Sequence, residues 1–78
     1  MKTTDLSLLV EARTAARTGE GVAVREAAGL SQGELARAVG ISPGTLSRWE
    51  AGLRKPTGPA ALRYARVLRA LPTERAAD

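Results

Sequence analysis

The stretch that decides the fold is LSQGELARAVGISPGTLSRWEAG, residues 30–52. It holds two short helical patterns on either side of Gly40, and glycine is the residue that most easily adopts the left-handed conformation of a tight turn. Ser31 and Glu34 have the spacing of a capping box, in which the serine hydroxyl and the glutamate carboxylate each bind a backbone amide of the other residue. These signals predict a helix over about residues 32–39.

The second half of the stretch starts a new helix within three residues of the glycine. Ser42 followed by Pro43 is an N-cap with proline at the first helical position, which predicts a helix over about residues 42–51. Two helices joined by a short turn that contains glycine are the signature of a helix-turn-helix, here placed at residues 31–52.

The rest of the chain also favours helices. Alanine is abundant, phenylalanine is absent, and β-branched residues do not alternate with polar ones as they do in strands. We expect an all-α, compact five-helix domain formed by residues 1–78 as a single unit. Its other predicted parts are helices over about 5–17 and 22–29, a break at 19–21, a last helix from Pro59, and a disordered tail over about 72–78.

Helical spacing predicts which side chains of the outer helices face the core. In the first helix the apolar stripe is Leu6, Leu9, Val10 and Ala16, with Leu8 and Ala12 close by. In the last helix the inward positions are Leu62, Ala65, Leu68 and Leu71.

Composition excludes several classes of function. The chain has no Cys and no His, so it lacks thiolate nucleophiles, imidazole bases and the usual zinc ligands, and no carboxylate pair is clustered. We therefore expect no enzyme activity, no cofactor and no metal. No apolar run approaches the roughly 20 residues that span a bilayer, and the residues after Met1 lack the basic, then apolar layout expected of a secretion signal. The expected location is the cytoplasm.

Charge is unevenly distributed along the chain. Residues 1–39 hold five basic and five acidic residues, whereas residues 40–78 hold seven basic and three acidic ones, so the whole net charge of +4 lies in the second half. A one-sided basic surface is typical of a protein that binds a polyanion, although a charge run is also common on a merely solvated face.

The helix over about 42–51 has two contrasting faces. At 100° per residue, the inward side takes Leu46, Trp49 and Leu53, and the outward side takes Gly44, Ser47, Arg48 and Ala51. A small, acid-free outer face lets the helix enter the major groove of B-DNA and brings its backbone near the bases.

Four residues are predicted to contact bases. Arg48 is the one long donor of the outer face and can bind guanine O6 and N7 in bidentate fashion. Ser47 lies beside it. Pro43 and Gly44 have no side-chain donors, so their contacts are of van der Waals type, for example with a thymine methyl group.

Another four residues are predicted to bind phosphates. Gln32 lies among the unpaired backbone amides at the start of its helix, which is a ready anion site, and Thr45 flanks Arg48. Arg54 and Lys55 follow the second helix directly, on a loop expected to lie along the sugar-phosphate backbone.

Glu50 lies beside inward residues, where an unpaired carboxylate is costly. We expect it to form a structural salt bridge with Arg25 of the preceding helix. Trp49 is interpreted as a core residue, because one Trp and one Tyr are too few aromatic side chains for stacking recognition of single strands.

The segment GLSQGELARAVGISPGTLSRWEAGLRKP resembles the Cro and phage-repressor type of helix-turn-helix, the xenobiotic-response-element or lambda-repressor-like family, over about residues 22–71. The positions that carry the resemblance are Ser31, Gln32, Glu34, Leu35, Ala36, Gly40, Ser42, Leu46, Ser47, Arg48, Trp49, Glu50, Gly52, Lys55 and Pro56.

The resemblance implies Gln32 as a backbone clamp, residues 43, 44, 47 and 48 as the base-facing set, and a salt bridge between Arg25 and Glu50. Members often carry a further helix after the last one predicted here, and the helix over about 5–17 is expected to take its place as an extra N-terminal helix.

Two functions remain open at this point. The first is a sequence-specific transcriptional regulator of double-stranded DNA, acting as a small repressor and as a homodimer on a palindromic operator, because one helix contacts only a few base pairs. The second is an antitoxin or adaptor, a protein-interaction module in which the apolar stripe from Leu6 to Val10 binds a protein partner.

Overall fold

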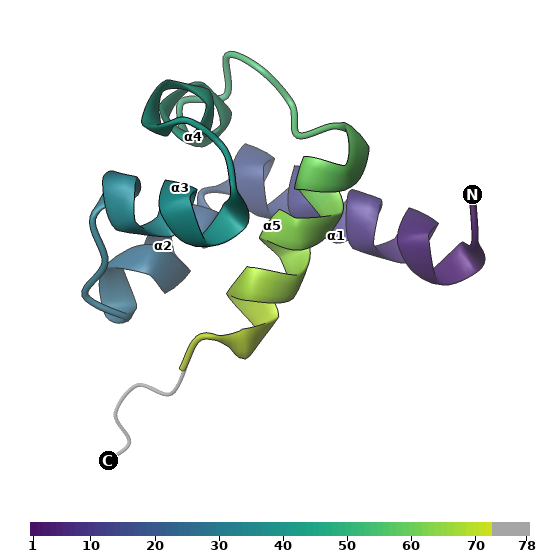
Figure 1. Ribbon diagram of the computed structural model, residues 1–78, viewed down its shortest axis with the longest axis horizontal. Helices are drawn as coiled ribbons and strands as arrows, with labels where there is room; N and C mark the ends of the chain where they lie inside the picture. The colour runs from purple at the N-terminus through teal and green to yellow at the C-terminus, as the bar shows by residue number, and fades with distance from the viewer. Residues whose placement is uncertain (73–78) are drawn as a thin grey trace.

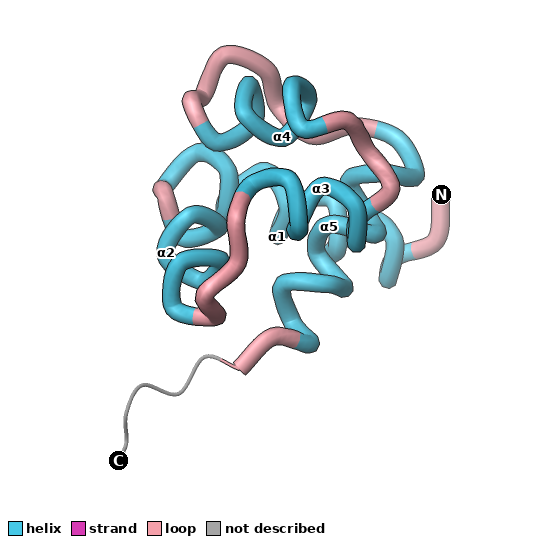
Figure 2. Tube along the Cα trace, turned by 60° about the vertical axis from the view of Figure 1, so that its left-hand side comes forward, coloured by secondary structure: helices cyan, strands magenta, loops and turns pink. Residues whose placement is uncertain are grey.

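Five helices make up the part of the chain that the computed structural model describes, residues 1–72. They are α1 (Thr3–Thr18), α2 (Glu20–Ala27), α3 (Gln32–Val39), α4 (Pro43–Glu50) and α5 (Gly58–Ala70). No strand occurs within these residues, and Figure 2 shows only helices and the loops between them. The all-α class and the helix-turn-helix are therefore confirmed, while the tail predicted from about residue 72 lies almost entirely outside the described residues.

The bounds of α3 and α4 follow from the local signals of the sequence. The Ser31 Oγ accepts a hydrogen bond from the Glu34 amide at 3.0 Å, and the Glu34 Oε1 accepts one from the Ser31 amide at 2.8 Å. Gly40 ends α3 at φ 85° and ψ 34°, a conformation that glycine adopts without strain. The Ser42 Oγ then accepts from the Thr45 amide at 3.0 Å and starts α4.

The core forms where α1 and α5 pack against each other and against the α3–α4 pair. In Figure 1, α4 lies at the top of the molecule and α5 runs down across its middle. Leu35, Ala36 and Leu46 are completely buried, and the ring of Trp49 lies tilted against that of Tyr64, with 5.2 Å between their centroids. Burial of these side chains fixes α4 on the rest of the molecule.

The predicted apolar stripe of α1 is wrong in part. Leu6 and Val10 are about half exposed, at 52% and 56%, whereas Leu8 is buried. The buried face consists of Leu8, Ala12, Ala15 and Ala16. Small alanines allow α1 to lie close to its neighbours, so the face richest in large side chains is not the face that packs.

Three other predictions need correction or addition. Leu53 is 75% exposed rather than inward. The reason is that α4 ends at Glu50, and the chain then turns away at Gly52, which has φ 76°.

The break expected at residues 19–21 is confined to Gly19, and α2 already begins at Glu20. In α5 the buried residues include Ala61 and Tyr64, which the predicted stripe omits, in addition to the predicted Ala65 and Leu68. Leu62 and Leu71 are only partly buried.

Gly21 is buried beneath the Tyr64 hydroxyl, so that a Cβ at this position would overlap the hydroxyl oxygen.

Within residues 1–72, every helix is too short or too polar to cross a lipid bilayer.

Candidate nucleic-acid interface

Helix α4 presents one buried and one exposed face. Leu46 and Trp49 are 0% and 3% exposed, whereas Gly44, Ser47 and Arg48 are exposed on the opposite side. Pro43 is also exposed, at the N-terminal end of the helix. The structure thus brings the four predicted base-contacting residues onto one accessible surface.

The Arg48 side chain lies back over Gly44, one turn earlier in α4. A Cβ at Gly44 would lie 3.5 Å from the Arg48 Nη1. The absence of a side chain at residue 44 therefore leaves space along the helix surface for the guanidinium group. Both residues belong to the same exposed strip, which has no acidic side chain.

Thr45 takes part in the N-cap of α4. The Ser42 hydroxyl donates to the Thr45 Oγ1 at 3.0 Å, while its oxygen accepts from the Thr45 amide. Because the Thr45 oxygen acts as the acceptor, its own hydroxyl hydrogen can still be donated to a ligand. Binding of a phosphate by Thr45 stays a prediction.

Gln32 is engaged within the protein. Its Nε2 donates to the Glu50 Oε1 at 2.8 Å, so the side chain bridges the start of α3 and the end of α4. The second hydrogen of the same amide group can still reach an anion, because the bond to Glu50 uses only one of the two. The sequence did not reveal this bond, since it joins residues that are 18 positions apart.

Arg25 and Glu50, paired in the sequence analysis, are in direct contact. The Arg25 Nε and Nη2 donate to the two carboxylate oxygens of Glu50 at 2.8 and 3.0 Å, and Nη1 donates to the Leu30 carbonyl at 2.9 Å. The two side chains are 12% and 5% exposed. The hydrogen bonds to Glu50 raise the pKa of Arg25 above its ordinary value. The pair thereby neutralises the only acid of α4 and removes it from the exposed face.

Arg54 and Lys55 are exposed in the loop of residues 51–57, here called the connector. The Leu53 and Arg54 amides both donate to the Arg48 carbonyl, at 2.9 and 3.3 Å. These bonds hold the first part of the connector against the end of α4. Both basic side chains therefore lie next to the helix that carries the predicted base contacts.

A contact that the sequence reasoning missed joins the connector to α1. The Arg13 Nε donates to the carbonyl of the buried Pro56 at 2.8 Å. No local pattern signals a bond between residues 43 positions apart.

Comparison with known proteins identifies the family of the chain. A family model described as helix-turn-helix matches residues 23–74, about two thirds of the chain. The match includes α3, α4 and α5, whereas α1 lies outside it. No curated protein matches the chain, and no solved structure does.

Proposed function

Because the chain belongs to this helix-turn-helix family, whose members are typically DNA-binding transcription regulators, we propose that it is a sequence-specific repressor that inserts α4 into the major groove of double-stranded DNA. One observation carries the proposal. Leu46 and Trp49 anchor α4 in the core, so that its small, acid-free face with Arg48 points outward. A face of this kind fits the width of the major groove and its negative potential.

The base contacts are assigned by side-chain chemistry. Arg48 donates two hydrogen bonds to guanine O6 and N7, and Ser47 supplies a smaller polar contact. Pro43 and Gly44 make close van der Waals contacts, for example with a thymine methyl group.

The phosphate contacts surround this strip. Arg54 and Lys55 lie along the sugar-phosphate backbone, and Gln32 and Thr45 donate to phosphate oxygens from the first turns of α3 and α4. Glu50 is neutralised by Arg25, so it does not repel the DNA.

A homodimer on a palindromic operator completes the proposal. One recognition helix contacts only a few base pairs, and two half-sites about 34 Å apart provide the specificity that one helix lacks. The two copies would then place two α4 helices in successive major grooves on one side of the duplex.

Selection of bound duplexes from a random-sequence pool tests this function. The expected result is an inverted repeat with half-site centres one helical turn apart, and an affinity that falls steeply as salt is added, because bound phosphates release counterions. Binding that is weak, unselective and insensitive to salt would exclude the repressor.

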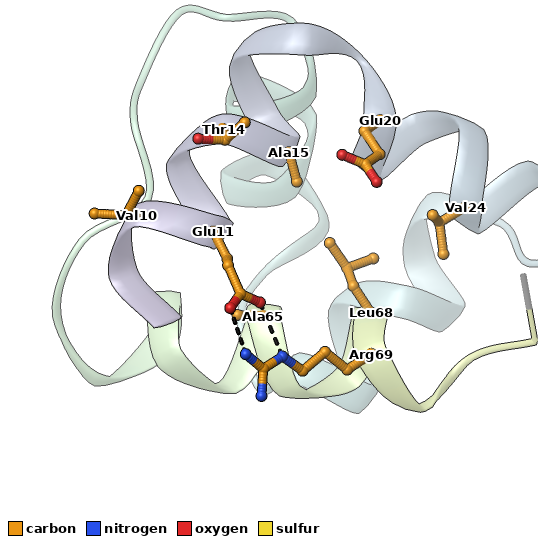
Figure 3. A pocket seen from close by; sticks show the side chains of 9 residues that line it. All are labelled: Val10, Glu11, Thr14, Ala15, Glu20, Val24, Ala65, Leu68 and Arg69. Carbon is orange, nitrogen blue, oxygen red and sulfur yellow. Dashed lines mark hydrogen bonds and ion pairs between the residues drawn. The ribbon is translucent and has the colours of Figure 1, made fainter. Parts of the chain in front are cut away.

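A second candidate function is an antitoxin or adaptor that binds another protein through α1. The observation that favours it is a hollow of about 340 Å³ between α1, α2 and α5, which is shown in Figure 3. Val10, Val24 and Leu68 contribute apolar side chains to it, and the half-exposed Leu6 lies one turn before Val10. An apolar surface of this kind can hold a hydrophobic anchor of a partner.

The variant Val10→Asp separates the two candidates when its mass in solution and its DNA affinity are measured together. A repressor that dimerises elsewhere keeps its mass and its operator affinity. If the protein is an adaptor, Val10→Asp no longer binds the stoichiometric protein partner, while the mass of the chain on its own stays the same. In that case neither the unaltered protein nor Val10→Asp shows salt-dependent DNA binding.

A further inference from the structure

Four cations surround a second hollow, which we call the basic hollow. Arg13 and Arg17 of α1 form one side of it, and Arg54 and Lys55 of the connector form the other. It has a volume of about 360 Å³ and is completed by Ala16, Trp49 and Gly52.

The walls of the basic hollow are held in place by the fold. Arg13, Ala16 and Arg17 have helical spacing and share one face of α1, which packs against α4. The bond from the Arg13 Nε to the Pro56 carbonyl ties this face to the connector. The positive groups are thus brought together by the tertiary structure rather than by one flexible segment.

No acid within residues 1–72 neutralises this cluster. None of the residues that line the hollow is acidic, and its four cations form no ion pair with a described carboxylate. On another face of α1 the situation is the opposite, because Asp5 pairs with Arg66 and Glu11 pairs with Arg69. Four like charges held close together repel one another, and a bound anion relieves that repulsion.

We propose that α1 belongs to the DNA-binding surface and that the basic hollow holds a phosphate of the DNA backbone, beyond the C-terminal end of α4. This inference rests on the function proposed above. The hollow continues directly from Arg54 and Lys55, and guanidinium groups match the geometry of phosphate oxygens.

The aromatic residue that lines the basic hollow, Trp49, favours a backbone phosphate over a base as the bound group. Trp49 is only 3% exposed and packs against Tyr64, so it offers no open ring face on which a base can stack. Phosphate contacts position a protein without selecting sequence, so α1 adds affinity and leaves base preference unchanged.

The test compares Arg17→Gln with the matched control Arg66→Gln, which removes the same charge from an exposed arginine outside the hollow. Affinity is measured over a range of salt concentrations for the duplex selected by the unaltered protein and for a scrambled duplex. We expect Arg17→Gln to weaken both by roughly fivefold to tenfold at low salt and to reduce the salt slope by about 0.9. Arg66→Gln is expected to keep the slope, as is the charge-conserving Arg17→Lys.

Duplexes that carry a single uncharged methylphosphonate linkage locate the phosphate. At one linkage position, the uncharged group is expected to weaken binding of the unaltered protein. The same group is not expected to weaken binding of Arg17→Gln any further, because that variant already lacks the contact. Circular dichroism and thermal unfolding verify that Arg17→Gln is folded, as expected for an exposed side chain.

The inference is overturned if Arg17→Gln and Arg66→Gln have the same salt slope and no linkage distinguishes Arg17→Gln from the unaltered protein. In that case the unaltered protein still binds its selected duplex in a salt-dependent manner, and the proposed function stands. Absence of salt-dependent duplex binding by the unaltered protein overturns both proposals.

Discussion

Two arginines of α5, Arg66 and Arg69, have surroundings opposite to those of the arginines near α4. Arg66 and Arg69 lie against Asp5 and Glu11 of α1, at the interface of the first and last helices. Arg48 and Arg54 meet no carboxylate among the described residues, because the one acid of α4, Glu50, is turned inward onto Arg25. The position of the acids therefore determines whether an arginine is neutralised by a carboxylate of the protein or leaves the surface positive, where it can attract a polyanion.

The largest effect is expected from breaking the ion pair between Arg25 and Glu50, which keeps the exposed face of α4 free of acid. Arg25→Met leaves the Glu50 carboxylate, which is 5% exposed, with only the amide of Gln32 as a partner. Breaking a fully buried pair on one side typically costs about 3–5 kcal/mol of folding free energy, and this partly buried pair is expected to lie at or below the lower end of that range. Urea unfolding measures the loss.

Two further variants are the controls for this prediction. Arg69→Met, which breaks an exposed pair, is expected to change stability far less. The double variant Arg25→Met/Glu50→Leu is expected to recover much of the loss, because no unpaired carboxylate is left at this partly buried site. Equal losses for Arg25→Met and Arg69→Met would contradict the contrast between the two regions.

The next effect concerns Tyr64, which lies in the core shared by both regions. Burial raises its pKa from 10.0 to about 12, so the folded protein holds the phenolic proton more tightly than the unfolded chain. The folding stability that is linked to this proton is fully present below pH 10.0. It is lost as the pH rises toward about 12, by about 1.4 kcal/mol per pH unit.

Tyr64→Phe provides the reference, because other groups also titrate in alkali. The difference in unfolding free energy between the two proteins is expected to change by about 2–3 kcal/mol over this pH range, in favour of the variant. At neutral pH the substitution is expected to cost little, since the hydroxyl has no hydrogen-bond partner among the described residues. A pH-independent difference would show that the hydroxyl is not buried.

A third prediction concerns DNA binding alone. Arg48→Ala is expected to lose about 1–3 kcal/mol of binding free energy and to relax preference at one base pair, because a bidentate contact to guanine is removed. Stability is expected to stay the same, since the side chain is exposed. Affinities for the selected duplex and for single-base variants measure the effect, and an unchanged base preference would remove Arg48 from the base contacts.

The smallest effect is expected at the exposed pair of α1 and α5. Hydrogen bonding to Arg69 lowers the pKa of Glu11 below its ordinary value of 4.5. The pair therefore contributes stability above pH 4.5, and the contribution is lost as the pH falls through the lowered pKa. Glu11→Gln is expected to be slightly less stable than the unaltered protein at neutral pH and equal to it in strong acid, and salt should reduce the difference. A large difference in unfolding midpoint at neutral pH would contradict the assignment of this pair as a weak surface contact.

The boundaries around α3 and α4 could be predicted because their signals are local. The capping box at Ser31, the left-handed Gly40 and the Ser42–Pro43 start all act within a few residues of the chain. Two buried side chains, Leu46 and Trp49, then indicate which face of α4 points outward. The exposure of Arg48 follows from the same helical spacing.

The faces of α1 could not be predicted in the same way. Its sequence offers two apolar surfaces, one with Leu6 and Val10 and one rich in alanine, and helical spacing does not rank them. The choice depends on where α5 crosses, because close packing favours small side chains at the contact.

The sequence by itself determined the helices, the turn between α3 and α4, the family and the face of α4 that is exposed, because caps, glycines and helical periodicity act over a few residues. Tertiary structure alone decided the contacts between distant residues: Gln32 with Glu50, Arg13 with Pro56, and Glu11 with Arg69, which are 18, 43 and 58 positions apart. Such contacts depend on how whole helices cross, and no local pattern records that geometry.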